Sequence, residues 1–81
     1  MNEEHLARLQ AIVEAALLAA GKPLSVEQLR DLFTEDERPT RQIMEHVLVM
    51  LDGACEGRGF ALKKVASGYR LQVRHAFAPW N

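Results

Sequence analysis

The sequence predicts a small α+β domain of the winged-helix type, with three helices, a small antiparallel sheet and a β-hairpin as the wing. Over the first two thirds of the chain, apolar residues recur at steps of three and four, the period of amphipathic helices. After the Gly57-Arg58-Gly59 turn the period falls to two, which is typical of strands. The expected order is helix, short extended segment, helix, helix and hairpin, which is the order of a winged helix.

The first helix is expected from Glu3 to Ala20. Glu3 and Glu4 in its first turn complement the helix dipole, and Gly21 is suited to end it in a left-handed conformation. Residues 22–24 should be extended, because Pro23 disfavours helical angles before it, and they are a candidate third strand. The apolar stripe of the helix consists of Leu6, Leu9, Val13, Ala16, Leu17 and Ala20.

A second, short helix is expected after Ser25, which forms a Ser-x-x-Gln capping box with Gln28. Its apolar face is predicted to consist of Leu29, Leu32 and Phe33. A charged turn, residues 34–39, separates it from the third helix.

Thr40 is the expected N-cap of a third helix that runs from about Arg41 to Cys55. Gly53 weakens its last turn, because glycine costs about 1 kcal/mol against alanine inside a helix. Val49 and Met50 fall outside the apolar stripe, and Glu45, His46 and Asp52 are expected to face outward. The stripe itself consists of Ile43, Met44, Val47, Leu48, Leu51, Ala54 and Cys55.

Two strands of matching length flank a tight turn at residues 66–68. In the first, Phe60, Leu62 and with them Lys64 alternate with Ala61, Lys63 and Val65; in the second, Tyr69, Leu71 and Val73 alternate with Arg70, Gln72 and Arg74. Residues 58–81 carry five bases and no acid, whereas residues 1–57 carry eleven acids and five bases, a balance of −6. This asymmetry indicates either an anion-facing wing or the solvated face of two strands. The candidate basic wing consists of Lys63, Lys64, Arg70 and Arg74.

The chain offers little for catalysis, and we expect no catalytic residue, no cofactor and no metal site. His46 and Cys55 are nine residues apart on one helix, too far for a Cys–His pair. No His or Cys residues have metal-ligand spacing, and Cys55 is expected to be a small buried apolar residue. No apolar stretch approaches the ~18 residues that span a bilayer, and no signal peptide is evident, so the cytoplasm is the expected compartment.

Two binding functions remain open. The first is DNA binding, in which a helix from Arg41 to Glu56 would contact the nucleobases. This helix has one basic and three acidic residues, a net charge of −2, and the turn before it is also acidic, so both repel phosphates. A basic wing alone would grip DNA weakly. The second is contact with other proteins, for which exposed Trp and Met side chains are suited. Trp80 is a candidate for such contact, and the alternative is that it covers the core of its own domain. The candidate interface residues are Val49, Met50, Phe77 and Trp80.

Three stretches resemble the N-terminal domain of ScpB, the segregation and condensation protein B of bacteria. They are AIVEAALLAAGKPLSVEQLRDLF, ERPTRQIMEHVLVML and GRGFALKKVASGYRLQVRHAFAPW, and together the resemblance spans residues 6–81. The last stretch is the most specific. One departure lies in HVLVMLDGACEGRG, which is more apolar than the Glu-rich third helix usual in the family.

The resemblance implies a non-catalytic, architectural role. ScpB-like proteins have two tandem winged-helix domains, form homodimers to which the N-terminal domain contributes, and bind the kleisin ScpA and through it SMC. The resemblance therefore implies a subunit that acts in chromosome condensation and segregation. Such a subunit is expected in the cytoplasm, associated with the nucleoid through the complex. Its contact with DNA is expected to be indirect or weak, and no contact with membranes is expected. By this expectation residues 1–74 are the winged helix and residues 75–81 are a tail leading toward a second winged helix that is absent from the chain.

Overall fold

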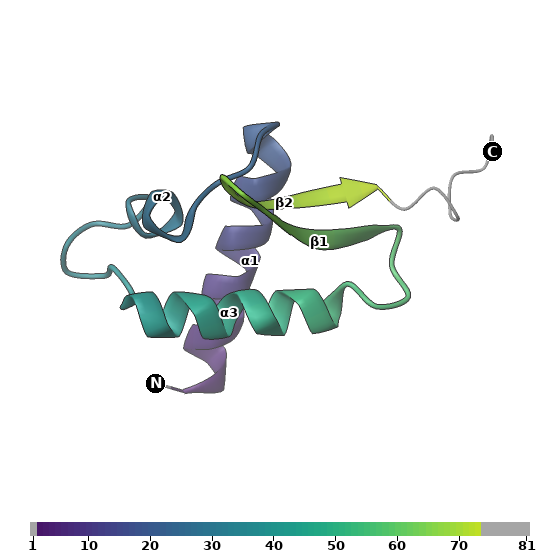
Figure 1. The fold of residues 1–81 in the computed structure, drawn as a ribbon. Coiled ribbons are helices and arrows are strands. Elements are labelled where there is room, and N and C mark those ends of the chain that lie inside the picture. The colour runs from purple at the N-terminus through teal and green to yellow at the C-terminus, as the bar shows by residue number, and fades with distance from the viewer. Residues whose placement is uncertain (1, 74–81) are drawn as a thin grey trace.

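The computed structural model describes residues 2–73, and its elements follow one another as the sequence predicts (Figure 1). In chain order these are α1 (Glu3–Ala20), α2 (Val26–Arg30), α3 (Arg41–Ala54), β1 (Phe60–Val65) and β2 (Gly68–Val73). The long helix α3 crosses α1, and the β1–β2 hairpin packs on both. The predicted α+β class, with three helices and a β-hairpin wing, is confirmed.

The predicted bounds of α1 are confirmed. Its N-cap is Asn2, whose side chain accepts the backbone N–H of His5 at 2.8 Å, a cap that we did not single out in the sequence. The helix ends at Gly21, which takes the left-handed conformation with φ of 67°, as predicted.

The capping box at the start of α2 is present. Gln28 donates its backbone N–H to Ser25 Oγ at 3.1 Å, and Ser25 donates its own to Gln28 Oε1 at 2.8 Å. However, α2 ends at Arg30, so Leu32 lies in the turn beyond it and is 52% exposed. The prediction that Leu32 shares the apolar face with Leu29 and Phe33 is wrong, because the helical period stops before it.

Helix α3 begins at the predicted cap, where Thr40 Oγ1 accepts the N–H of Ile43 at 3.1 Å. It continues through Gly53 to Ala54, and Cys55 is its C-cap. The prediction that Ala54 lies on the buried side is wrong, because this side chain is exposed. Successive helical residues are about 100° apart, so the buried stripe is centred near Met44 and Leu51, and Ala54 falls just beyond its Val47 edge.

The core lies where α1 and α3 cross beneath the hairpin. Each buried leucine, valine or methionine stabilises the fold by about 1.5–3 kcal/mol relative to an exposed one. Among the residues that the structure describes, no buried side chain is polar or charged. The core consists of Leu9, Val13, Leu17, Val26, Leu29, Met44, Val47, Leu48, Leu51 and Cys55.

The connector between α1 and α2 joins the hairpin at one point. Leu24 donates to Tyr69 O at 2.9 Å and accepts from Tyr69 N at 2.8 Å, forming a single antiparallel bridge in place of the predicted short strand. Gly68 permits this close approach: it has φ of 143°, and a Cβ there would lie 2.3 Å from the carbonyl carbon and oxygen of Leu24.

Candidate protein-interaction surface

The strand register divides the predicted basic wing. Because Lys63 pairs with Arg70, and Lys64 with Tyr69, Lys64 lies on the opposite face of the sheet from the other two cations. Lys64 shares its face with the Leu62–Leu71 pair, which packs against the core. The fourth predicted member, Arg74, lies outside the described residues.

Each face of the hairpin holds its cations differently. On the inner face, Lys64 Nζ lies 5.9 Å from the centre of the Tyr69 ring, within range of a cation–π interaction. On the outer face, Lys63 and Arg70 stand directly opposite each other, and like charges in that position destabilise a sheet. This outer pair is therefore a local cost to the fold.

The predicted interface residues of α3 are accessible to different degrees. Val49 is 69% exposed, as expected for a residue outside the apolar stripe, whereas Met50 is half-buried. The other two candidates, Phe77 and Trp80, lie outside the described residues. The structure therefore brings one exposed candidate, Val49, to the surface of α3.

Val49 lies at the edge of a hollow between α3 and the hairpin, which we call the α3–hairpin hollow. Its volume is about 300 Å³, and it unites Val49 with Lys64, two candidates that the sequence placed in different groups. Charges of both signs line it, because Glu45 and Asp52 face it from α3. The complete lining is Glu45, Leu48, Val49, Asp52, Leu62, Lys64 and Tyr69.

A second hollow, the α1–hairpin hollow, lies where the end of α1 meets β2. Its volume is about 290 Å³. Leu18 is 57% exposed there and was missed in the sequence, although it falls outside the α1 stripe just as Val49 falls outside that of α3. The lining is Leu17, Leu18, Gly21, Lys22, Pro23, Arg70 and Leu71.

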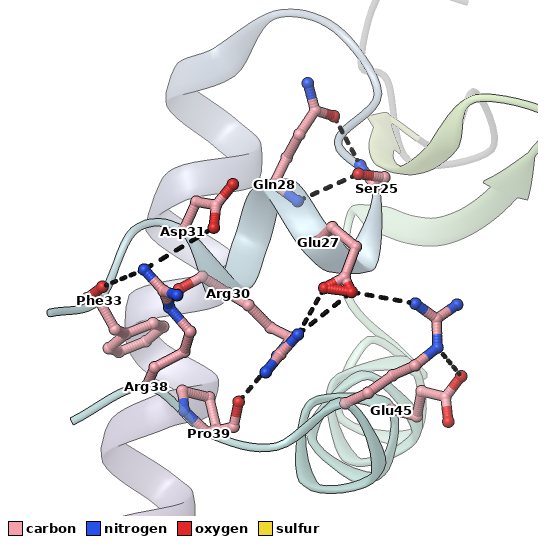
Figure 2. A network of polar contacts seen from close by, with 10 residues as sticks. Ser25, Glu27, Gln28, Arg30, Asp31, Phe33, Arg38, Pro39 and Glu45 are labelled. Atoms are coloured by element: carbon pink, nitrogen blue, oxygen red, sulfur yellow. Dashed lines mark hydrogen bonds and ion pairs between the residues drawn. The ribbon is translucent and has the colours of Figure 1, made fainter. Parts of the chain in front are cut away.

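The turn between α2 and α3 is fixed by arginines (Figure 2). Arg30 pairs with Glu27 and donates from Nε to the carbonyl of Pro39 at 3.0 Å. Arg38 donates from Nε to the carbonyl of Arg30 at 3.2 Å and from Nη2 to that of Phe33 at 3.4 Å. These bonds satisfy carbonyls of a turn that has no regular structure, and so they hold α2 against the start of α3.

The same network forms ion pairs with Arg41, the arginine that α3 would present to DNA. Arg41 lies 3.3 Å from Glu27 and 3.6 Å from Glu45, so two carboxylates share its guanidinium. The hydrogen bond from Arg30, with the charges of Arg30 and Arg41, lowers the pKa of Glu27 despite some desolvation. The start of α3 is therefore neutralised by its own neighbours and presents little positive charge to a phosphate.

Residues 2–73 bring together no group of three or more His, Cys, Asp or Glu side chains suited to a metal ion. Cys55 is fully buried, and burial raises the pKa of its thiol, which disfavours the nucleophilic thiolate. In the same part of the chain, no helix is both long and apolar enough to cross a membrane.

The element order and the antiparallel hairpin define a winged-helix domain. The family model for the segregation and condensation complex subunit ScpB matches residues 11–81. Since that match covers most of the chain, the chain belongs to the ScpB family.

Two curated relatives agree with this assignment. The segregation and condensation protein B homolog of Coxiella burnetii is 41% identical over 69 residues, which are 85% of this chain and 33% of that protein. Segregation and condensation protein B of Syntrophotalea carbinolica is 38% identical over 72 residues, or 89% and 36% of the two chains. The chain therefore spans about a third of the length of these relatives.

Solved structures share the fold. A dimer of the ScpB N-terminal domain, complexed with a ScpA peptide, matches with a TM-score of 0.78 and 29% identity over 93% of this chain and 85% of that chain. ScpB from Mycobacterium tuberculosis matches with a TM-score of 0.75 and 25% identity, over 93% of this chain and 46% of that one. A conserved hypothetical protein from Chlorobium tepidum, at 24% identity and a TM-score of 0.71 over 98% and 49% of the two chains, supports the fold alone.

Proposed function

We propose that this chain is a non-catalytic part of a bacterial SMC–kleisin complex that condenses and segregates chromosomes. In this role it pairs with a second copy of itself and binds a segment of a ScpA-type kleisin. One observation carries the proposal: the solved ScpB N-terminal domain that this fold matches is a dimer complexed with a ScpA peptide. The proposed place of action is the cytoplasm, at the nucleoid.

The surface supports a binding role. Leu18 and Val49 are large apolar side chains more than half exposed, and each lies at a hollow of about 290–300 Å³, large enough for a side chain of a partner. The assignment of Val49, Met50, Phe77 and Trp80 to the interface remains a prediction. So does the division into a winged helix over residues 1–74 and a tail over residues 75–81.

The test is to measure the mass of the purified chain by light scattering and its affinity for the ScpA of the same organism by calorimetry. We expect a dimer mass and saturable binding of ScpA. A strictly monomeric chain with no affinity for ScpA would overturn the proposal. The matched control is Leu51→Ala, in the core, which should lose both properties only by unfolding, visible as a loss of helical circular dichroism.

A further inference from the structure

We propose that the α1–hairpin hollow is the docking site for a ScpA segment in which one aliphatic or aromatic side chain is flanked by carboxylates. This inference rests on the proposed function and adds to it the place and the chemistry of the contact. It is drawn from the shape of the hollow, its apolar floor and the sign of the charges around it.

The floor of the hollow is apolar. Leu17 is the most buried of its lining residues, only 4% exposed, while Pro23 and Leu71 are half-buried. Leu18, 57% exposed, stands at the edge and would lose water contact when a partner side chain enters. A volume of about 290 Å³ accommodates one large apolar side chain and the backbone that carries it.

The charges at the rim have one sign. Lys22 and Arg70 both line the hollow, and Lys63 stands opposite Arg70 on the neighbouring strand. The ion pairs found within residues 2–73 involve other cations, namely Arg30, Arg38, Arg41 and Arg58. The repulsion between Lys63 and Arg70 is relieved when an anion lies beside them. A carboxylate next to the apolar anchor supplies that charge.

The other hollow does not select a partner in this way. Its rim carries Glu45 and Asp52 on one wall and Lys64 on the other, and Glu45 is already bound by Arg41. A phosphate backbone would pair with Lys22 and Arg70, but it brings no apolar group to cover Leu18 and Leu71. An acidic, apolar peptide segment satisfies both the floor and the rim.

The first experiment measures the dissociation constant of full-length ScpA with the parent chain and with three single variants, Leu18→Ser, Lys22→Glu and Arg70→Glu. All three side chains are exposed, so circular dichroism and thermal melting should remain near those of the parent. We expect each variant to weaken binding at least tenfold.

Two controls match these changes. Arg8→Glu makes the same charge change on an exposed residue of α1, about 15 Å along the helix axis from Leu18. Val49→Ser removes the exposed apolar side chain of the α3–hairpin hollow. Both should bind ScpA within about twofold of the parent. If Val49→Ser weakens binding and the three hollow variants do not, the segment docks at the other hollow and this inference is wrong.

The second experiment tests the carboxylates. Overlapping synthetic peptides of ScpA are titrated against the parent chain, and the tightest one is remade with Asn and Gln in place of Asp and Glu. We expect the amide peptide to bind at least tenfold more weakly, and salt to weaken only the acidic peptide. Equal affinities of the two peptides would overturn the inference.

The failures can be told apart. If the parent chain binds neither ScpA nor its peptides, the proposed function fails and the inference fails with it. If the parent binds but the three variants bind equally well, only the inference fails. If the variants change a dimer into a monomer and leave ScpA affinity intact, the hollow holds a second copy of the chain, and the inference is again wrong.

Discussion

Gly68 leaves room for the backbone bridge between Leu24 and Tyr69 that ties the hairpin to the connector after α1. Any side chain at this position meets the Leu24 carbonyl at 2.3 Å and takes a positive φ that disfavours L-residues. We expect Gly68→Ala to lower the free energy of unfolding by about 1–3 kcal/mol. Each kcal/mol corresponds to a fall of about 4–8 °C in the melting temperature of a domain this small, which differential scanning calorimetry measures.

Gly53 provides the matched control for that substitution. It lies inside α3, and a Cβ there would meet nothing within 4 Å. Gly53→Ala should therefore stabilise the domain by about 0.5–1 kcal/mol, because alanine loses less backbone entropy than glycine in a helix. Equal shifts of the two variants in the same direction would contradict the assigned role of Gly68.

Core and surface leucines and valines should respond differently to truncation. Leu51 is fully buried beneath the hairpin and Leu17 is 4% exposed, so Leu51→Ala and Leu17→Ala should each cost about 2–5 kcal/mol. Val49→Ala, at a position 69% exposed, should change stability by less than about 0.5 kcal/mol. Urea denaturation of the three variants checks this, and a Leu51→Ala variant as stable as the parent would show that the helix faces are wrongly assigned.

At the scale of elements, caps and periodicity predicted most of the fold, since both depend on residues close together in the chain. Ser25 and Thr40 start helices by accepting a backbone N–H three residues on, and Gly21 ends one by its left-handed conformation. Leu32 and Ala54 were misplaced because the sequence does not show where the last helical turn ends or how wide the buried stripe is. Those limits are set by packing against other elements.

The arginine-fixed turn between α2 and α3 makes stability depend on pH. Because the pKa of Glu27 is lowered in the folded state, the charged carboxylate favours folding above its ordinary value of 4.5. This contribution is lost as the pH falls through the lowered, folded-state value. We expect Glu27→Gln to destabilise the domain at neutral pH and to match the parent in acid, as measured by the urea midpoint across pH.

Glu35→Gln is the control for this effect. Glu35 lies in the same turn and is exposed, and the ion pairs found within residues 2–73 do not include it. Its substitution should leave the difference between neutral and acidic stability unchanged. If Glu35→Gln and Glu27→Gln have the same effect, the pH dependence arises from overall charge and not from the arginine pairs.

At the scale of the whole molecule, the candidate surface was the part least accessible to sequence reasoning. Leu18 and Leu71 are 53 positions apart in the chain and meet only because the hairpin packs on α1. Alternation along the strand already predicts that Lys63 and Lys64 face opposite sides, but the position of Lys63 directly across from Arg70 follows only from the register. A charge asymmetry can be counted in a sequence, but which charges stand opposite each other across two strands cannot.

This distribution of charge also predicts how the molecule meets DNA. Arg41 is held by two carboxylates, α3 carries Glu45 and Asp52, and the outer face of the described hairpin offers two cations, Lys63 and Arg70. Two phosphate contacts give a slope of only about −2 for log affinity against log salt. We therefore expect anisotropy titrations with labelled duplex DNA to show at most weak binding at low salt and none at moderate salt.

The double variant Lys63→Glu, Arg70→Glu is the sharper probe of this expectation, since it reverses both outer cations and leaves Lys64 on the inner face untouched. It should abolish whatever binding remains at low salt. Saturable binding at moderate salt, lost in the double variant, would mean that the wing grips DNA directly. Lys63 and Arg70 would then bind DNA phosphates, and not a carboxylate of ScpA. Competition between duplex DNA and the ScpA peptide for the parent chain would decide between these two roles.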